Sequence, residues 1–499
     1  LGPDFVYFGG TTQTNAGQLA KDMVAVGLDA KFMVPDGCFE NAFIQAAGPE
    51  IVENRAFITF GGVPADKLTG KGAEFYKRYV AKYGNEPQAY AVYGYVAAQV
   101  ALDAIAKAGV KDREAVRLAV TQTRQEDGAL GTWSFDANGD TTMTRMSGNT
   151  VRAGKFEFVT LLGDSGDEKK AAAGTVGSAG GGPWAVIGQQ AIIGLTNGMI
   201  FALIALGYTM VYGVLEFINF AHGDLFMLAS FFALTLIGFL GLGDAGPVWL
   251  VGGLGLVVVA SGLFAGALNA AVDRFVYRPL RHAPKLAPLV SAIGMSFVFQ
   301  NLGLFWGGLP LKVMGDGKAA AAPKAFPDLV SSANLLGPDA ALRVTARDLL
   351  VVFSSLVLMA ALYAFVKYSR LGKGMRAVAQ DPVAARLMGV HVDGVIRATF
   401  FLGGMLAGFA AVIYGLYINT IHYQIGYQNG LYAFTAAVVS GIGNIPGAVL
   451  GGLIIGLVRS FSDQWIGAQW QQAVVFGLLI VLLVFRPSGL LGGTSREKV

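Results

Sequence analysis

Long apolar runs recur along the second part of the chain, beginning at Val186. Most of them are about 20 residues long, which is the length that an α-helix needs to cross the hydrocarbon core of a bilayer. Such runs predict an α-helical polytopic membrane protein with about eight to nine membrane segments. The candidate segments are residues 186–213, 217–240, 248–272, 288–309, 348–368, 395–419, 431–443, 446–462 and 470–485.

The seventh and eighth candidates are short, and the sequence GIGNIPG at residues 441–447 separates them. Pro446 and the glycines interrupt helical structure there. A broken helix at membrane depth is tolerated only where protein or a water-filled cavity pairs the freed backbone groups. We therefore expect two half-spans or a kinked pair, with Asn444 as a polar residue inside the membrane.

The first 162 residues differ from the rest of the chain. The whole sequence is 54% hydrophobic and only 14% charged, yet residues 1–162 alternate charged and apolar positions as a soluble α/β domain does. Alternating strands and helices predict a parallel sheet with ligands at the carboxyl ends of its strands. The expected strands are residues 3–8 and 30–34, and the expected helices are residues 17–27, 71–83 and 88–108.

A Gly/Ala/Ser-rich tract at residues 163–185 joins the two parts and predicts a flexible linker. We expect three regions: an α/β domain at 1–162, this linker, and a membrane domain at 186–499. The first residue is Leu1 rather than Met, and no signal segment precedes the soluble part. We therefore expect a chain truncated at its start, and a missing secretory signal would place the first domain outside the cytoplasm.

Charge and cysteine content exclude several classes of function. The formal net charge of +4 is small and is spread over loops, so we expect no nucleic-acid partner. Cys38 is the only cysteine, which excludes an internal disulfide and supports no cysteine-based metal site. The P-loop pattern G-x-x-x-x-G-K-[ST] does not occur, so we expect no cofactor in this chain and no ATP site.

Basic residues predict the orientation of the membrane segments. One cluster, which contains Arg274, Arg278, Arg281 and Lys285, follows the third candidate segment, and a second cluster follows the fifth. Because cytoplasmic loops are enriched in Lys and Arg, these loops should face the cytoplasm and the N-terminus should lie outside. The loop at 310–347 conflicts with this scheme. It would lie outside, yet it carries Lys312, Lys318, Lys324, Arg343 and Arg347.

The second basic segment, residues 369–390, carries the signals of its own short helix. Asp381 followed by Pro382 is typical of an N-cap and first helical position, and Gly389 stands where such a helix would stop. The helix would present an apolar face of Val383, Leu387 and Met388. Two alternatives remain open: the face rests on the bilayer surface, or it docks on a partner from the cytosol.

Polar groups stand at the start of the second candidate segment, in the sequence NFAHGD at 219–224. Asn219, His222 and Asp224 are costly in lipid, and such groups commonly mark a transport pathway or an interface. The alternative is an interfacial loop that holds His222 and Asp224 at the level of the lipid headgroups.

Glycines four residues apart are frequent in the membrane part and allow helix backbones to approach closely. They suit a compact bundle or a dimer, and for any single pair generic helix packing is the simpler interpretation. The pairs are Gly262/Gly266, Gly404/Gly408, Gly447/Gly451 and Gly452/Gly456.

Several long segments, in order, resemble the permease subunit of bacterial branched-chain amino acid ABC importers. They are residues 207–228, 277–301, 369–390 and 434–456, and the resemblance covers about 186–499. It implies a multi-pass permease in the bacterial cytoplasmic (inner) membrane that carries branched-chain or related amino acids and is not an enzyme. The implied partners are cytoplasmic ATPase subunits, a second permease subunit or a second copy, a periplasmic binding protein, membrane lipids and the amino-acid substrate.

In that family, the cytoplasmic segment corresponding to 369–390 docks on the ATP-hydrolysing subunit, so the resemblance favours partner docking for the short helix. The residues it implies for this coupling are Arg376, Asp381, Pro382, Leu387, Met388 and Gly389.

Residues 2–160 resemble the C-terminal portion of a periplasmic leucine/isoleucine/valine-binding protein, with the main part of that family's first lobe absent. The resemblance implies that Asp36 pairs with the ligand's α-ammonium group, a role for which a carboxylate is suited. Thr11 falls where some members place a tyrosine. Asp36 is also a natural turn residue before Gly37.

Two other interpretations of the whole chain remain: a membrane receptor that senses an amino acid, and a fusion of fragments from two adjacent transporter genes. The residues do not separate branched-chain amino acids from other amino acids, amides or urea as the substrate.

Overall fold

The computed structural model divides the chain into two compact units, Leu1–Thr175 and Val176–Val499. The described residues are 3–136, 139–143, 145–162, 183–215, 219–281, 283–284, 286–315, 320–337, 340–441, 443–467, 470–486 and 488–491. Most of the predicted linker, residues 163–182, falls outside them. Its last residues are helical, because the first helix of the second unit begins at Pro183.

A five-stranded sheet organises the N-terminal unit, in the order β1-β2-β3-β6-β7. The first three strands are parallel, but β6 pairs antiparallel with both β3 and β7. The prediction of a parallel sheet is therefore wrong for the second half of the sheet. The turn between β6 and β7 accounts for the antiparallel pairing of these two strands, because Ala153 and Gly154 both have positive φ, as a two-residue hairpin turn requires.

The elements of this unit are β1 (Phe5–Tyr7), α1 (Ala16–Ala25), β2 (Lys31–Val34), α2 (Asn41–Ala47), α3 (Pro49–Val52), β3 (Ala56–Phe60), α4 (Lys71–Tyr83), α5 (Ala91–Ala108), α6 (Arg113–Thr121), β4 (Arg124–Gly128), β5 (Gly131–Ser134), β6 (Met146–Arg152) and β7 (Lys155–Leu162), with 3-10 turns at Thr12–Thr14, Asp36–Cys38 and Ala65–Lys67.

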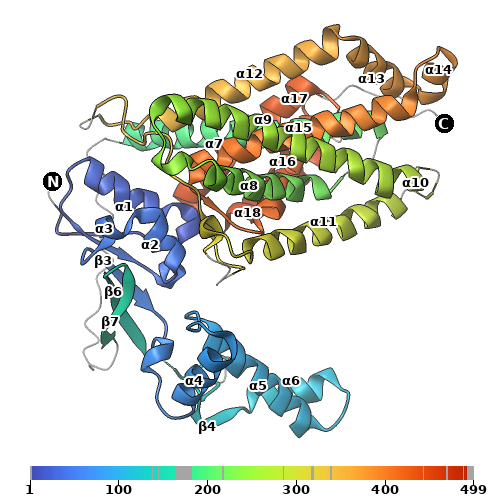
Figure 1. Cartoon of the computed structure of the whole chain (residues 1–499). Coiled ribbons are helices and arrows are strands. Elements are labelled where there is room, and N and C mark those ends of the chain that lie inside the picture. Colours follow the sequence, from blue (N-terminus) through green and yellow to red (C-terminus); the bar gives the residue numbers. More distant parts are fainter. Residues whose placement is uncertain are drawn as a thin grey trace. The chain divides into compact units, whose positions relative to one another are not determined.

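Two separate apolar clusters form the interior of the N-terminal unit. One lies between the sheet and helices α1 to α3 and includes Phe32, Phe43 and Ile58. The other gathers α5 and the β4–β5 hairpin around Trp133. The unit therefore consists of two lobes, which Figure 1 shows as the α1–α3 and α4–α6 regions.

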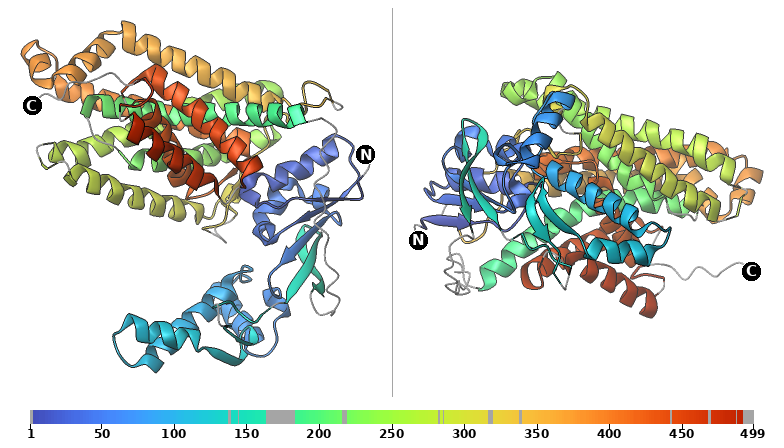
Figure 2. Two further views of the ribbon diagram at one scale, coloured as in Figure 1. Left: turned by 180° about the vertical axis from the view of Figure 1, so that it is seen from behind. Right: turned by 90° about the horizontal axis from the view of Figure 1, so that it is seen from below.

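The second unit is a bundle of long helices, and every predicted membrane segment corresponds to one of them. Seven described helices are long and apolar enough to cross a membrane, and α18 is a shorter apolar helix. The bounds are α7 (Pro183–Leu215), α8 (Ala221–Phe239), α9 (Pro247–Val272), α11 (Leu286–Gly307), α12 (Ala346–Tyr368), α15 (Val392–Ile418), α16 (Ile425–Ser440), α17 (Ile445–Trp465) and α18 (Gln471–Phe485). The helices lie side by side in the further views of Figure 2.

The predicted break between the seventh and eighth segments is confirmed, but α17 spans 21 residues and is not a half-span. Gly441 and Gly443 flank the break with positive φ, and Asn444 caps α17 by accepting a hydrogen bond from the Gly447 N–H at 3.3 Å. The backbone N–H groups of residues 490 and 491 donate to the carbonyls of residues 439 and 440, each at 2.9 Å. Protein therefore pairs the carbonyls at this end of α16, as burial demands.

The predicted glycine pairs lie at contacts within the bundle. Gly262 and Gly266 of α9 face the Gly404 and Gly408 region of α15, where a Cβ built on Gly408 would lie 2.7 Å from the Gly262 Cα. A Cβ built on Gly198 of α7 would lie 2.8 Å from the Gly452 carbonyl oxygen of α17. These glycines therefore serve close packing inside one chain.

Short elements mark the two ends of the bundle. A π-helical turn at Asp273–Tyr277 and α10 (Arg278–Leu280) lie at the same end as α13 (Arg370–Gln380) and α14 (Pro382–Leu387), as Figure 1 shows. Arg278 and Arg281 both form ion pairs with Asp393 of α15 there, at 3.0 and 2.5 Å. These ion pairs bring the two predicted cytoplasmic loops together.

A short strand pair connects the loop between α11 and α12 to the residues that follow α15. In it, β8 (Lys324–Ala325) pairs with β9 (Thr420–Ile421).

Three of the five cations of the 310–347 loop that conflicted with the orientation scheme have local partners, and Lys318 lies outside the described residues. The Lys324 ammonium donates to the Met314 carbonyl at 2.9 Å, and Arg343 donates to the Ser332 carbonyl at 2.9 Å. Arg347 is paired with Asp328. These three charges hold the loop together, which gives them a role independent of membrane orientation.

Candidate functional site

The membrane unit contains a cavity of about 340 Å³, formed by α7, α8, α11 and α16. Its size falls within the range of about 300–1,000 Å³ that is usual for small-molecule sites. The lining residues are Tyr208, Phe220, Asp224, Ile293, Ser296, Phe297, Gln300, Gln424, Gly426, Tyr427, Gly430, Leu431 and Phe434.

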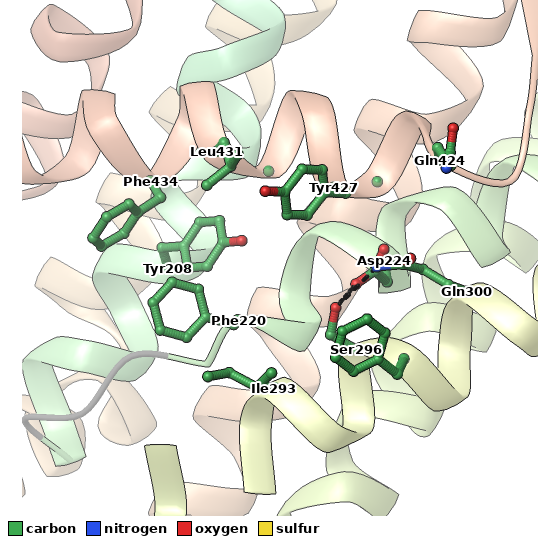
Figure 3. A pocket seen from close by; sticks show the side chains of 13 residues that line it. Tyr208, Phe220, Asp224, Ile293, Ser296, Gln300, Gln424, Tyr427, Leu431 and Phe434 are labelled. Carbon is green, nitrogen blue, oxygen red and sulfur yellow. Dashed lines mark hydrogen bonds between the residues drawn. The ribbon is translucent and has the colours of Figure 1, made fainter. Parts of the chain in front are cut away.

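Asp224 is the one acid among these lining residues and is only 1% exposed. It lies in the first turn of α8. Its Oδ2 accepts a hydrogen bond from the Ser296 hydroxyl of α11, and the Gln300 amide donates to that hydroxyl at 3.2 Å. Its Oδ1 makes no hydrogen bond within the described part of the chain. Figure 3 shows the three side chains together on one side of the cavity.

The opposite side of the cavity is aromatic and apolar. Figure 3 shows Tyr208, Phe220 and Phe434 there, facing the acidic side. The rings of Phe220 and Phe434 pack at 5.6 Å between centroids. The hydroxyl groups of Tyr208 and Tyr427 both point into the cavity. The site therefore combines one carboxylate and hydroxyl donors with an apolar wall.

The other predicted intramembrane residues lie close by but do not line the cavity. His222 is buried behind it, with its ring 4.8 Å from the Tyr208 ring. His222 and Asp224 lie in the first turns of α8 rather than in a loop, and the bundle buries both. Asn219 accepts from the Tyr277 hydroxyl at 2.7 Å and donates to Asn269 at 3.3 Å, and it therefore joins α8 to α9. Asn444 caps α17 at the end of the bundle near the chain's last described residues.

Sequence reasoning missed Ser296 and Gln300. They stand four residues apart in the apolar helix α11 and so share a face. Two polar residues at that spacing in a membrane-length run are the signal that could have identified them. Tyr208 and Tyr427 carry no comparable signal, because tyrosine is common on apolar helices.

The predicted short helix is present at the end of the bundle that holds α10. Asp381 caps α14 by accepting from the Val383 and Ala384 N–H groups at 2.8 and 3.0 Å, and Pro382 is at its first turn. Gly389 has a φ of 83°, as a helix-ending glycine does. Leu387 and Met388 are each 83% exposed. An apolar surface, named here the α14 face and made of Val383, Leu387 and Met388, is left uncovered within this chain.

Arg376 belongs to a helix that the sequence did not indicate. It lies in α13, which begins after the Ser369 cap and buries Met375 and Val378 against the bundle. Its guanidinium donates to the carbonyls of Val366 and Lys367 at the end of α12, at 2.8 and 3.0 Å. The observed contact of Arg376 therefore holds the α13–α14 segment to the bundle.

In the N-terminal unit, Thr11 and Asp36 follow strands β1 and β2, at one edge of the sheet. A Cβ built on Gly37 would lie 2.7 Å from the Thr11 methyl group, so the two loops touch. The Asp36 carboxylate accepts from the Tyr90 hydroxyl of the other lobe at 2.8 Å. Burial and this carboxylate raise the pKa of Tyr90. The sequence did not indicate Tyr90, because it stands 54 residues from Asp36 and no local pattern links the two residues.

A bundle of membrane-length helices around a cavity with one buried acid and an apolar wall defines a polytopic membrane protein built for transport. The family described as the permease component of branched-chain amino acid transport systems matches residues 190–484. The chain therefore belongs to that family. The periplasmic binding protein family matches residues 1–155.

Individual relatives agree with both matches. The high-affinity branched-chain amino acid transport system permease protein BraD of Pseudomonas aeruginosa is 39% identical over 317 residues, which are 62% of this chain and 97% of that protein. The Leu/Ile/Val-binding protein homolog 2 of Brucella abortus is 33% identical over 143 residues, which are 29% of this chain and 37% of that protein.

Among solved structures, a leucine-binding protein of Thermotoga maritima matches with 29% identity and a TM-score of 0.30, over 32% of this chain and 45% of that one. The two resemblances found in the sequence are thus confirmed by the family matches.

Proposed function

We propose that the membrane unit forms the path by which branched-chain or related amino acids cross the bacterial cytoplasmic membrane. In this proposal, separate ATPase subunits bind at the α14 face, and a second permease subunit or second copy completes the translocation unit. A periplasmic binding protein delivers the substrate. The proposed division of the chain is a partial binding domain at 1–162, a linker at 163–185 and the permease domain at 186–499.

The cavity is the observation that carries this proposal. The bundle holds a pocket of about 340 Å³ that is open on the side of the exposed residues Phe297 and Tyr427, and Asp224 is buried beside it. Ionisable groups inside a membrane domain are costly and are typical of transport pathways. The apolar wall suits an aliphatic side chain, and the branched-chain specificity is that named for the relative BraD.

Filling the cavity should block transport. We expect Leu431→Trp to lower leucine uptake at least about tenfold, because a larger ring would occupy space that the substrate needs. The measurement is uptake of labelled leucine by cells that also express the ATPase and binding-protein partners. Leu450→Trp is the matched control, since Leu450 is exposed on α17 and does not line the cavity. Equal uptake by both variants would contradict the proposed path.

The proposed orientation places the α14 face in the cytoplasm and the N-terminal unit and the 310–347 loop outside. The grouping of the basic residues of α10, α13 and α14 at one end of the bundle supports it.

Single cysteines test the orientation. Ser331 and Ala384 are both exposed and lie in the two loops that should face opposite sides. In intact cells, a membrane-impermeant thiol reagent should label Ser331→Cys and leave Ala384→Cys unlabelled. The native Cys38 should react slowly, because burial raises the pKa of its thiol to about 12. Replacing it with serine removes that background, and labelling of Ala384→Cys would reverse the proposed orientation.

In the N-terminal unit, the proposed ligand contacts are Asp36 for the α-ammonium group and Thr11 beside it. The hydrogen bond between Asp36 and Tyr90 supports this placement, because it lies where the two lobes of the unit meet. Binding proteins of this kind hold their ligand between lobes.

A further inference from the structure

We propose that Asp224 binds the α-ammonium group of the transported amino acid inside the membrane cavity. This inference rests on the proposed function and adds the chemical class that the cavity recognises: amino acids with a free ammonium group and an aliphatic side chain. The hydroxyl groups of Tyr208 and Tyr427 would receive the carboxylate end of the same molecule.

The Asp224 carboxylate is only partly hydrogen-bonded within the described part of the chain. A buried charge is stable only when it is paired and hydrogen-bonded. Oδ2 is held by Ser296, which Gln300 in turn supports, whereas Oδ1 has no hydrogen-bond partner among the described residues. None of the residues that line the cavity is basic. A bound ammonium group would supply both the missing countercharge and the missing hydrogen bond.

The Asp224 side chain is held in place by contacts with two other helices. Ser296 and Asp224 are 72 residues apart and come from different helices, so their hydrogen bond fixes the carboxylate against α11. Gly426 of α16 lies on the other side of Asp224, where a Cβ would come within 2.9 Å of Oδ1. The glycine therefore allows α16 to pack directly against Asp224, and any side chain at this position would displace the carboxylate.

The rest of the cavity offers hydroxyl groups and apolar surface. Phenol hydroxyls can donate hydrogen bonds to a carboxylate, and both tyrosine hydroxyls point into the cavity. The apolar lining residues Phe220, Ile293 and Phe434 offer a surface to an aliphatic side chain. A metal ion fits poorly, because the described residues contain no group of three or more His, Cys, Asp or Glu side chains that could hold one.

The test measures binding of leucine and two analogues to the purified full chain in lipid nanodiscs. Leucinol keeps the ammonium group and lacks the carboxylate, whereas 4-methylpentanoate keeps the carboxylate and the carbon skeleton and lacks the ammonium group. The chain carries Asp36→Ala so that the N-terminal unit contributes little binding. Saturation-transfer NMR detects the weak binding expected of a transport site, and competition with labelled leucine ranks the analogues.

We expect leucinol to displace leucine and 4-methylpentanoate to compete at least about tenfold less well. Asp224→Asn keeps the shape of the side chain and removes its charge. It should weaken leucine binding about tenfold to a hundredfold, the usual worth of a hydrogen bond to a charged group, and should abolish the preference for leucinol. Asp224→Glu should retain the preference. Asp463→Asn is the matched control, because Asp463 is exposed on α17 outside the cavity.

Equal competition by the two analogues would overturn the inference, and this measurement needs no change at Asp224. Unchanged leucine affinity in Asp224→Asn would also overturn it. Leucine uptake by the unaltered chain separates the role of Asp224 from the proposed transport function. Uptake without analogue discrimination contradicts only the role of Asp224, whereas absence of uptake in the presence of all partners contradicts the proposed function itself.

Discussion

Replacing both Leu387 and Met388 with aspartate is expected to abolish amino-acid uptake, by more than about a hundredfold, while the membrane unit still folds and inserts. Both side chains are 83% exposed and contribute no core packing. Asp381 and Pro382 fix the helix that presents them, so the face is rigid. Apolar anchors at the centre of an interface often contribute 2 kcal/mol or more each, roughly, and two carboxylates in their place would carry a desolvation cost in addition.

The measurement is co-purification of the ATPase subunit together with substrate-stimulated ATP hydrolysis. Leu335→Asp with Leu336→Asp is the matched control, because these are also adjacent, exposed leucines, but in the loop between α11 and α12. The control should leave the ATPase subunit bound. Persistence of that subunit and of stimulated hydrolysis in the Leu387 and Met388 variant would show that α14 does not couple the two proteins.

The helix α14 could be predicted because its determinants are local. A cap, a proline at the first turn and a stopping glycine follow within nine residues. The preceding helix α13 was not predicted, because Gly372 and Gly374 weaken its helical signal. Gly372 is required there by close approach, since a Cβ at that position would contact the carbonyls of Phe365 and Val366.

The membrane helices could be predicted for a different reason. A bilayer demands long apolar segments with internally paired backbones, so composition alone identifies them. It does not identify how they pack. The bond between Ser296 and Asp224 joins different helices, and no local pattern indicates that pairing. The existence of a polar pathway residue was therefore predictable, while the cavity around it was not.

The orientation prediction was likewise limited by tertiary contacts that composition does not reveal. Counting basic residues treats every Lys and Arg as an exposed charge. Lys324 is buried at 5% exposure and donates to a carbonyl oxygen, and burial lowers the pKa of its ammonium group to about 8. Arg347 is likewise buried beside Asp328. These residues are structural, a property that the sequence count could not reveal.

Gly408→Leu is expected to prevent stable folding of the membrane unit. A Cβ at Gly408 would lie 2.7 Å from the Gly262 Cα and 2.8 Å from the Ser261 carbonyl carbon, both backbone atoms of α9 that cannot rotate away. The two helices would have to separate along their whole contact. Overpacking a well-filled core costs about 1–3 kcal/mol and sometimes more, and we expect the upper end because backbone rather than side chain must move.

Gly255→Leu is the matched control, because a Cβ built on this glycine of α9 has nothing within 4 Å. Thermal unfolding of the detergent-solubilised chain, followed by size-exclusion chromatography, should show a large loss of stability for Gly408→Leu and little change for the control. If Gly408→Leu instead unfolded at the same temperature as the unaltered chain, the close packing of α9 and α15 through their glycines would be contradicted. Glycine contacts within one chain also predict that the loss is independent of protein concentration, whereas a dimer contact at these glycines would make the melting temperature rise with concentration.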